Sequence, residues 1–433
     1  MKALVAVVAA GMVSCSMLAF TPTSAIAVEQ SASEKSSATK NKRVKRAQTM
    51  REQVFKRLEV ARDLADKNQY AEALEELESL ERMRRNSYEK AMTYNMVAYV
   101  HFNQEDYPGA IKAYEQLIAI DNIPESLEQN TLYSLAKLYL IGEDYKKALG
   151  PLNRWFGLVE KPSAEAYVLR AQIYFQLEQF KKALPDIKVA ISEEKAKGKK
   201  PRENWLMLER AIYYQNRDFV SLARCLQDLA TYYPKGQYWM QLSAVYSELG
   251  KPMKELSTLE TAYDKGLLDK ENQLISLVQA LLSQEVPYKA ARILSKGMKD
   301  GQIEDNARNL SMLGDAWMLA KEYDKAIVVM AKAAKASGKG DDYFKLAQIH
   351  TERQEWKQAL TNVDNALKDN KVKNRDSVRT LKGLVLFNMD NLEAAEKVFV
   401  SLKKDRPEDR MAAQWLTYIQ GEKQRRAYMA EVQ

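Results

Sequence analysis

The stretch LSMLGDAWMLAKEYDKAIVVMAKAA, residues 310–334, carries the pattern that decides the fold. Gly314 and Trp317 stand three positions apart, so they share one face of a helix. Further along the stretch, Ala326 and Met330 share one face of a second helix in the same way. The stretch therefore predicts two successive helices, each with one apolar face.

The same pattern returns along most of the chain at an average interval of roughly 36 residues, which is typical of a solenoid. Each unit buries its apolar face against its neighbours, so one continuous core replaces the separate domains that 433 residues would otherwise suggest. Gly (16) and Pro (11) are scarce, which favours helices throughout. The second helix of each unit is predicted to begin at Tyr70, Tyr107, Tyr145, Phe180, Phe219, Pro252, Tyr288, Tyr323, Trp356 and Leu392.

Other positions recur relative to these first residues. A small residue nine positions earlier lets the partner helix approach closely; it is Ala61, Ala98, Ala136, Ala171, Gly314, Ala347 or Gly383. Six positions earlier stands a larger residue, namely Leu64, His101, Tyr139, Tyr174, Tyr213, Tyr246, Leu282, Trp317, His350 or Leu386. Three positions later stands Ala73, Ala110, Ala148, Ala183, Ala291, Ala326, Ala359 or Ala395. Each unit is therefore predicted to be a helical hairpin.

At these residues the chain resembles the tetratricopeptide repeat (TPR) family. The segment Trp239-x-x-Leu242-Ser243-x-x-Tyr246 and the corresponding residues of 310–334 match the family pattern. The resemblance implies an all-α fold: a right-handed α-solenoid of about ten TPR-like helical hairpins with a C-terminal capping helix. The predicted organisation is a signal peptide in 1–27, a disordered basic leader in 28–47, the solenoid in 48–406, and the capping helix and tail in 407–433.

Some segments depart from the pattern. Pro252 stands where other units have an aromatic residue, and EEKAKGKKPRE, residues 193–203, reads as an inserted basic surface loop. In the capping helix an apolar stripe is expected to pack on the last hairpin; it consists of Met411, Trp415, Leu416 and Ile419.

The amino terminus indicates export. A positive residue is followed by an apolar run, and Ala25-Ile26-Ala27 before Val28 is a signal-peptidase pattern that places the cut between Ala27 and Val28. Two alternatives stay open: acylation of Cys15, whose preceding residues loosely resemble a lipobox, and retention of the run as an anchor. Either way, the expected location is the periplasm.

Composition excludes several function classes. Without Cys15, Cys225 is the last thiol, so no intramolecular disulfide is expected. The two histidines, His101 and His350, occupy one repeat position and are interpreted as packing residues. No nucleotide-binding, metalloprotease or hydrolase motif occurs. We therefore expect no enzyme activity, no cofactor and no metal, and the net charge of +8 is attributed to solubility, with no nucleic-acid partner.

The TPR resemblance implies a concave groove lined by the first helix of each hairpin, and rings together with amides suit capture of an extended peptide. An alternative is that several of these rings pack between repeats. The candidate protein-binding residues are Asn95, Tyr99, Phe102, Asn103, Lys137, Leu140, Gln172, Phe175, Tyr214, Asp315, Met318, Gln348 and Phe387.

Two functions follow as hypotheses. The first is a periplasmic scaffold that binds envelope proteins. The second is a TPR component of polysaccharide or peptidoglycan export and assembly, in which aromatic rings would stack on sugars. Within the first, the leader, length and basic mature chain look similar to exported TPR proteins that accompany TonB–ExbB–ExbD systems. That resemblance implies a partner in the TonB complex or an outer-membrane receptor, with membrane contact only through the leader, a lipid anchor or the partner. The sequence leaves the oligomeric state open.

Overall fold

A computed structural model describes residues 49–432. The predicted signal peptide (1–27) and basic leader (28–47) lie outside the described residues, and so do Cys15 and the proposed cleavage site Ala27–Val28. Those predictions are therefore not tested by the structure.

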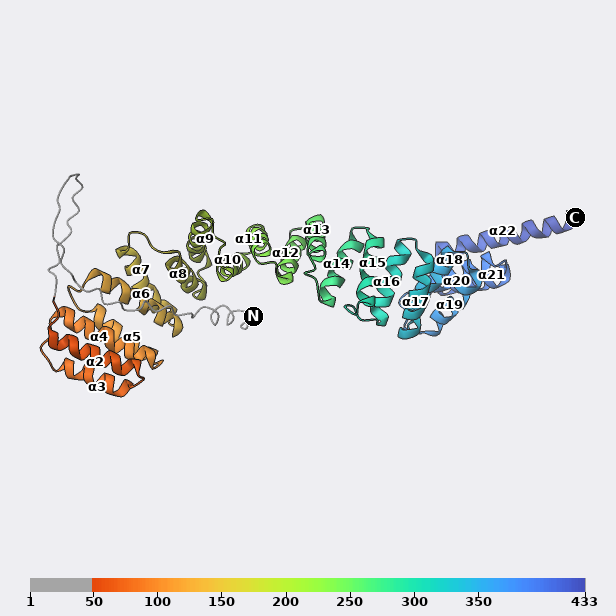
Figure 1. The fold of residues 1–433 in the computed structure, drawn as a ribbon. Helices are drawn as coiled ribbons and strands as arrows, with labels where there is room; N and C mark the ends of the chain where they lie inside the picture. The colour runs from red at the N-terminus through yellow and green to blue at the C-terminus, as the bar shows by residue number, and fades with distance from the viewer. Residues whose placement is uncertain (1–48, 433) are drawn as a thin grey trace, which may run out of the picture. The chain divides into compact units, whose positions relative to one another are not determined.

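The described residues form 21 α-helices and no strand (Figure 1). The helices of the first half are α2 (Glu52–Asp66), α3 (Tyr70–Glu81), α4 (Ser87–Asn103), α5 (Tyr107–Ile118), α6 (Glu125–Ile141), α7 (Tyr145–Leu158), α8 (Ala164–Gln176), α9 (Phe180–Ala196), α10 (Glu203–Gln215) and α11 (Phe219–Tyr232). Those of the second half are α12 (Gly236–Glu248), α13 (Pro252–Asp264), α14 (Glu271–Ser283), α15 (Pro287–Lys299), α16 (Ala307–Leu319), α17 (Tyr323–Ser337), α18 (Gly340–Glu352), α19 (Trp356–Lys368), α20 (Arg375–Asn388), α21 (Leu392–Asp405) and α22 (Arg410–Val432).

In chain order the helices form pairs, from α2–α3 to α20–α21, and α22 follows alone. We call the first helix of each pair the A helix and the second the B helix. The all-α architecture of helical hairpins predicted from the sequence is confirmed. No helix within residues 49–432 has both the length and the apolar character that a membrane span requires.

Close packing divides the chain inside α11 into two compact units, with described parts 49–225 and 226–432. In the first unit, Leu77 and Leu80 belong to one buried cluster, and Leu135 and Leu152 belong to another. In the second unit, α12 to α18 contribute to a large cluster, and smaller clusters join α18 to α22. Each unit therefore has a core made where successive helices meet.

The small residues of the A helices lie where the B helices cross them. Ala61, Ala98 and Ala136 are fully buried. A methyl group added to Gly314 would lie 2.5 Å from Cε of Met330, and one added to Gly383 would lie 2.6 Å from ring atoms of Phe399. The sequence prediction that a small residue permits close helix approach agrees with this geometry.

The turn inside each pair has a conformation that the sequence did not reveal. Two residues before the B helix, the backbone has positive φ in every pair, at Asn68, Glu105, Glu143, Glu178, Arg217, Gly250, Glu285, Lys321, Gln354 and Asp390. In the α4–α5 turn, the Asp106 amide donates to the His101 carbonyl (2.8 Å), and the Glu105 amide donates to the Phe102 carbonyl (3.0 Å). This is a Schellman ending, which usually has glycine at the left-handed residue. Gly250 is the one glycine in this set.

In the seventh pair, α14–α15, the B helix begins one residue earlier than the sequence predicted. Its B helix begins at Pro287 rather than Tyr288, and the left-handed residue Glu285 stands two positions before it, as in the other pairs. Leu281 is fully buried where Leu282 was expected, while Tyr288 is 47% exposed. Proline suits the first residue of a helix because its φ is fixed and its missing N–H needs no partner there.

Two further segments differ from expectation. The basic insertion is partly helical, because α9 continues to Ala196 and residues 197–202 alone connect it to α10. The last helix continues to Val432 instead of ending in a tail. On that helix, Ala412 is buried while Met411 is 54% exposed, so the expected stripe is wrong at Met411.

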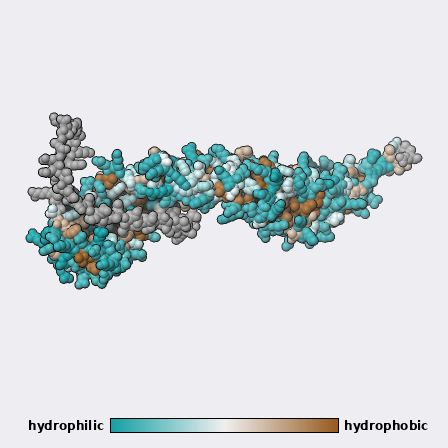
Figure 2. All heavy atoms as spheres, viewed as in Figure 1, coloured by the Kyte–Doolittle hydropathy of each residue, from teal (hydrophilic) through white to brown (hydrophobic). Residues whose placement is uncertain are grey.

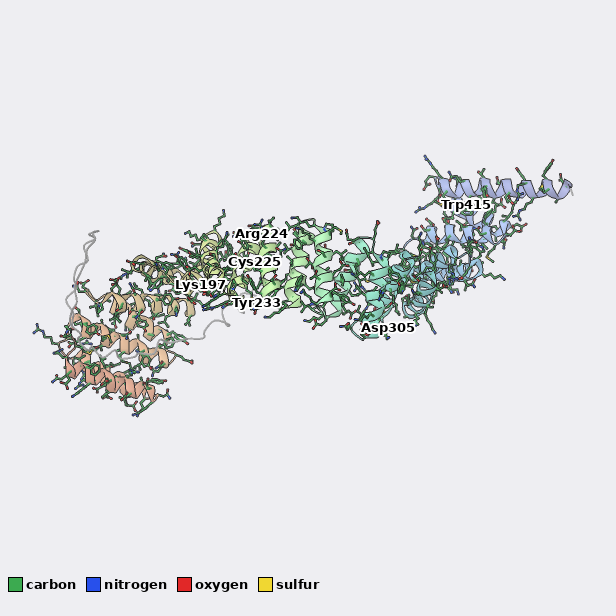
Figure 3. The ribbon with its side chains drawn as sticks, turned by 45° about the horizontal axis from the view of Figure 1, so that its top comes forward. Lys197, Arg224, Cys225, Tyr233, Asp305 and Trp415 are labelled. Atoms are coloured by element: carbon green, nitrogen blue, oxygen red, sulfur yellow. The ribbon has the colours of Figure 1, made fainter. Side chains whose placement is uncertain are left out.

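Trp415 on α22 and Cys225 on α11, both labelled in Figure 3, make packing contacts. The Trp415 ring stacks on Phe399 with centroids 5.7 Å apart, and Ile419 is fully buried, so α22 packs on the last pair as the capping prediction supposed. The Cys225 thiol is buried and donates to the Leu206 carbonyl (3.3 Å), which fits a structural cysteine.

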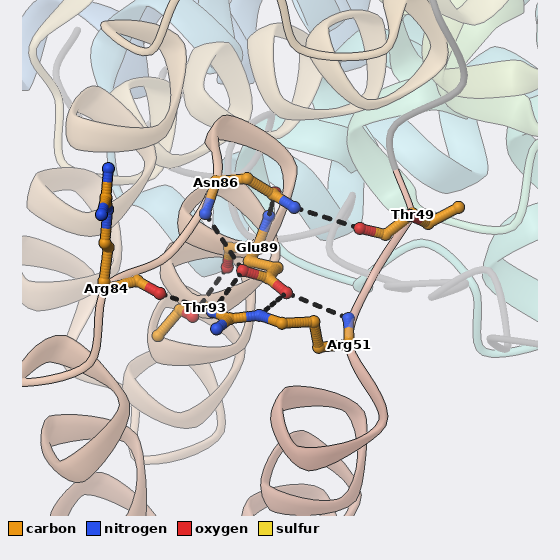
Figure 4. A network of polar contacts seen from close by, with 6 residues as sticks. All are labelled: Thr49, Arg51, Arg84, Asn86, Glu89 and Thr93. Carbon is orange, nitrogen blue, oxygen red and sulfur yellow. Dashed lines mark hydrogen bonds and ion pairs between the residues drawn. The ribbon is translucent and has the colours of Figure 1, made fainter.

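A polar network joins α2 to α4 at the other end (Figure 4). The fully buried carboxylate of Glu89 accepts hydrogen bonds from Nε (2.9 Å), Nη2 (2.8 Å) and the amide (3.0 Å) of Arg51. Glu89 also completes a capping box with Asn86, which in turn donates to the Thr49 carbonyl (3.1 Å). Hydrogen bonding from Arg51 is the main reason that the pKa of Glu89 is lowered to about 2.

Gly383→Ala tests the close approach of the helices. The added methyl group would overlap the Phe399 ring. Overpacking costs about 1–3 kcal/mol, and the better helix propensity of alanine returns about 1 kcal/mol at most. We expect the free energy of unfolding to fall by about 1–2 kcal/mol in denaturant titrations followed by circular dichroism. In a Phe399→Leu background the same change should be neutral or stabilising, and an equal loss in both backgrounds would contradict the packing argument.

Glu89→Gln tests the polar network. The pKa of Glu89 is lower in the folded chain than its ordinary value of 4.5, so the ionised carboxylate stabilises the fold above about pH 4.5. That contribution is lost as the pH falls from about 4.5 to about 2. We expect Glu89→Gln to lower the free energy of unfolding by about 1.5–3 kcal/mol at neutral pH, and the difference from wild type to shrink across this window. Glu72→Gln, at an exposed carboxylate on α3, is the matched control and should change neither quantity.

Candidate protein-binding surface

The thirteen residues predicted to bind a partner all lie on A helices: α4, α6, α8, α10, α16, α18 and α20. None of them is buried in a core. Lys137, Tyr214 and Gln348 are exposed, and the other ten are half-buried. We call the side chains five and eight positions before each B helix the A-face. The positions suit contact with a partner, while binding itself stays a prediction.

Three of the predicted rings already have partners within the chain. Phe102 meets Tyr107 edge-on at 5.9 Å, and Phe175 meets Phe180 in the same way at 5.4 Å. In both pairs, the ring five positions before the B helix packs on the first residue of that helix. Phe387 instead contacts Trp415 and Tyr418 of α22. These rings contribute to packing, as the alternative interpretation of the sequence proposed.

Tyr214 occupies the same position in its pair and is 63% exposed. Tyr99 is held differently, because its hydroxyl donates to Oδ1 of Asp66 (2.6 Å), and this hydrogen bond raises the pKa of Tyr99. Asn95 and Asn103 lie half-buried on the same helix. The first unit therefore presents one largely free ring and one ring anchored by its hydroxyl.

An aromatic cluster beside Lys137 was missed from the sequence. The Lys137 ammonium lies 4.5 Å from the centroid of the Tyr133 ring, which packs on Trp155 (5.1 Å). Burial raises the pKa of Tyr133 to about 12. The four-residue spacing of Tyr133 and Lys137 on one helix was the available signal, since such residues are neighbours on its surface.

The cluster continues onto α8. Phe156 lies between Trp155 (5.3 Å) and Tyr167 (5.2 Å), and the Arg170 guanidinium stands 3.7 Å from the centroid of the Phe156 ring. Nε and Nη2 of Arg170 each donate to a carboxylate oxygen of Asp186 at 2.7 Å. A paired carboxylate and a stacked ring thus fix the arginine, so we assign this group a structural role.

In the second unit, the predicted residue Asp315 belongs to a polar network. Nζ of Lys345 lies 2.6 Å from Oδ2 of Asp315 and donates to Oγ of Ser311 (3.1 Å). Asp342, which is buried, accepts from Ser311 (2.9 Å) and Ser337 (2.6 Å). Burial raises the pKa of Asp315 despite the neighbouring ammonium. This network joins α16 to α18 below the half-buried Met318.

A hollow of about 370 Å³ lies between α12, α13 and α14, at a place that the sequence did not indicate. Its lining comprises Met240, Ser243, Ala244, Ser247, Glu248, Glu255, Leu259 and Ser276. Ala244 and Ser247 are A-face residues of their pair. Both residues are small, whereas the corresponding positions of α4 hold Tyr99 and Phe102.

The histidines are bound to neighbouring carboxylates. Nδ1 of His350 lies 2.6 Å from Oε2 of Glu355, and Nδ1 of His101 lies 2.8 Å from Oδ2 of Asp106. Both carboxylates stand just before a B helix, and His350 is 8% exposed. This agrees with the prediction of a structural position. Within residues 49–432, no group of three or more histidine, cysteine, aspartate and glutamate side chains is arranged to hold a metal.

Comparisons with known proteins agree with this architecture. Residues 58–126 match the tetratricopeptide repeat model, and residues 105–189 match the model described as anaphase-promoting complex, cyclosome, subunit 3. The comparison with curated proteins found no match.

Solved structures resemble the chain at low identity. YrrB, a TPR protein with an unusual peptide-binding site, is 13% identical with a TM-score of 0.37, over 44% of this chain and 97% of that one. A tetratricopeptide repeat protein from Parabacteroides merdae is 18% identical with a TM-score of 0.35, over 61% and 98%. Naa15/Naa10 bound to HypK-THB is 12% identical with a TM-score of 0.43, over 85% of this chain and 66% of that one. TM-scores of this size support no shared ligand or function.

The two family models together span residues 58–189. Beyond that range, pairs such as α16–α17 and α20–α21 again have a small residue, Gly314 or Gly383, where the B helix crosses. Residues 58–126 are therefore similar to tetratricopeptide repeats, and the resemblance to that superfamily is supported.

Proposed function

We propose that this protein is an exported scaffold that binds envelope proteins through its A-face. Tetratricopeptide repeats generally mediate protein–protein interactions and typically serve as scaffolds rather than as enzymes. The observation that carries the proposal is the placement of the predicted binding residues: all are accessible, and all stand on helices whose opposite sides are buried. A surface of this kind presents side chains in fixed positions at little entropic cost.

The chemistry of the A-face suits an extended segment of a partner. Tyr214 and Met318 offer apolar area, and Gln348 offers an amide group that can bond a peptide backbone. On the face shown in Figure 2, hydrophilic residues dominate and hydrophobic ones form small separate patches. This mixture favours recognition of a partly polar segment over an obligate apolar interface.

For the partner, we propose an envelope protein, with the TonB–ExbB–ExbD complex and outer-membrane receptors as the first candidates. This part of the proposal rests on the sequence: the signal-like leader, the roughly ten-unit length and the basic mature chain. The corresponding location is the periplasm.

Photo-crosslinking tests the binding surface. We expect p-benzoylphenylalanine at Lys137, Tyr214 or Gln348 to crosslink a partner in cells, because these A-face positions are exposed. The same residue at Val328 or Val400, which are exposed on B helices, is the control and should give little crosslinking. Mass spectrometry of the adducts identifies the partner.

The outcomes separate the two parts of the proposal. Crosslinks confined to the B helices would contradict binding through the A-face. Crosslinks from the A-face to proteins other than TonB, ExbB, ExbD or a receptor would support the scaffold function and contradict the TonB assignment. Retention of the purified chain on peptidoglycan or polysaccharide, without protein adducts, would favour the export and assembly role instead.

Mass spectrometry of the mature protein tests export. We expect the first residue to be Val28 with a free amino group, because the preceding residues form a signal-peptidase pattern. A diacylglyceryl group on Cys15 would establish a lipoprotein, and an intact Met1 in membrane fractions would establish an anchor.

A further inference from the structure

We infer that the hollow between α12, α13 and α14 is a site for a lysine or arginine side chain of the bound partner. This inference rests on the proposed scaffold function and specifies one feature of the segment that the A-face binds. The hollow has a volume of about 370 Å³ and lies entirely within the second unit. That volume falls in the range of about 300–1,000 Å³ that is usual for ligand sites.

The lining of the hollow accepts hydrogen bonds. The hydroxyl of Ser243 donates to the Met240 carbonyl (2.8 Å), and that of Ser276 donates to the Asn272 carbonyl (2.8 Å). These two hydroxyl hydrogens are therefore already used, and what the serines retain is acceptor capacity. Ionised carboxylates likewise only accept. The acceptors that Ser243, Ser276 and the two carboxylates present therefore suit a group that donates hydrogen bonds.

The two carboxylates of the lining carry charge without a partner. Glu248 is exposed and Glu255 is half-buried, and neither forms an ion pair within residues 49–432. Asp315 and Asp376, on other A helices of this unit, each face a cation. The chain as a whole carries +8, so its general field repels cations. Attraction of a cation here must come from the local carboxylates.

The remaining lining suits the stem of a long basic side chain. Met240 is half-buried and presents apolar surface beside the carboxylates, while Leu259 also lines the hollow but is almost completely buried. Lysine and arginine bury their methylene groups against such surface and keep the charged end at a polar rim. An apolar wall next to unpaired carboxylates thus matches these two side chains better than a small inorganic cation or a neutral residue.

The hollow also lies where a bound segment would pass. Ala244 and Ser247 are its A-face residues, so a chain lying along the A-face crosses its opening. In this pair both A-face residues are small, whereas the corresponding residues of α4 are Tyr99 and Phe102.

Methyl NMR of the whole chain, labelled with [methyl-¹³C]methionine, tests the site, because Met240 lines it and Met240→Leu assigns its signal. The probes are Nα-acetyl-lysine methylamide and Nα-acetyl-arginine methylamide, with the norleucine derivative as a neutral probe of the same stem. We expect the two cationic probes to shift the Met240 signal to saturation, and the neutral one to shift it little. Raising the salt from about 0.05 M to about 0.3 M should weaken binding.

The matched variants are Glu248→Gln/Glu255→Gln and Glu72→Gln/Glu75→Gln; the second pair removes two exposed carboxylates of α3. We expect the first to weaken binding of the cationic probes at least about tenfold and the second to leave it unchanged. An equal shift with the norleucine probe, no shift with any probe, or full binding to the first variant would overturn the inference. Tighter binding of putrescine than of either derivative would overturn it in favour of a diffusible amine.

The result is distinguishable from that of the crosslinking experiment. If the cationic probes do not bind but the A-face crosslinks form, the basic side-chain site is overturned and the scaffold function is not. Saturable probe binding without A-face crosslinks would contradict the scaffold and leave no partner segment to supply the side chain, so it too would overturn the inference.

Discussion

The close contact between the two helices of each pair is the constraint on which the rest of the structure depends. Where Phe399 or Met330 lies against the A helix, the opposing residue has no side chain, since even one methyl group would overlap. Ala61 and Ala98 serve the same purpose in the first unit. Fixing the distance between the helices also fixes which side of the A helix stays uncovered. The A-face is therefore a consequence of the packing.

The repeated positions made the helices predictable from sequence, because each depends on side-chain size and spacing alone. The turns were less predictable. A left-handed residue was to be expected at glycine, yet Glu105 and Arg217 adopt that conformation, held by the Schellman hydrogen bonds and the packing on either side. The predicted first residue of α15 was wrong for a related reason. The aromatic Tyr288 resembled the first residues of the other B helices, but Pro287 is better suited to the first turn of a helix.

For the binding surface, the sequence predicted where the residues lie better than it predicted what their side chains contact. The repeat predicts which residues lie on the uncovered side of an A helix, and the side chains of Tyr214 and Gln348 are exposed there. It does not predict which rings turn inward. Phe102 and Phe175 pack on the first residue of their own B helix, and that contact depends on side-chain rotamers rather than on spacing. The hollow was invisible for the same reason, because it depends on side chains from three helices.

Positions where a helix pair departs from the repeat are the positions where that pair differs in chemistry from its neighbours. Seven of the ten pairs have alanine or glycine at the helix crossing, where packing alone explains the residue. The A-face positions are not constrained in this way, and there the chain changes from Tyr99 and Phe102 to Ala244 and Ser247. In the first case the protein supplies the side chains, and in the second it supplies space bordered by Glu248 and Glu255. What each pair presents on its A-face therefore depends on these unconstrained positions, and any single pair offers few contacts.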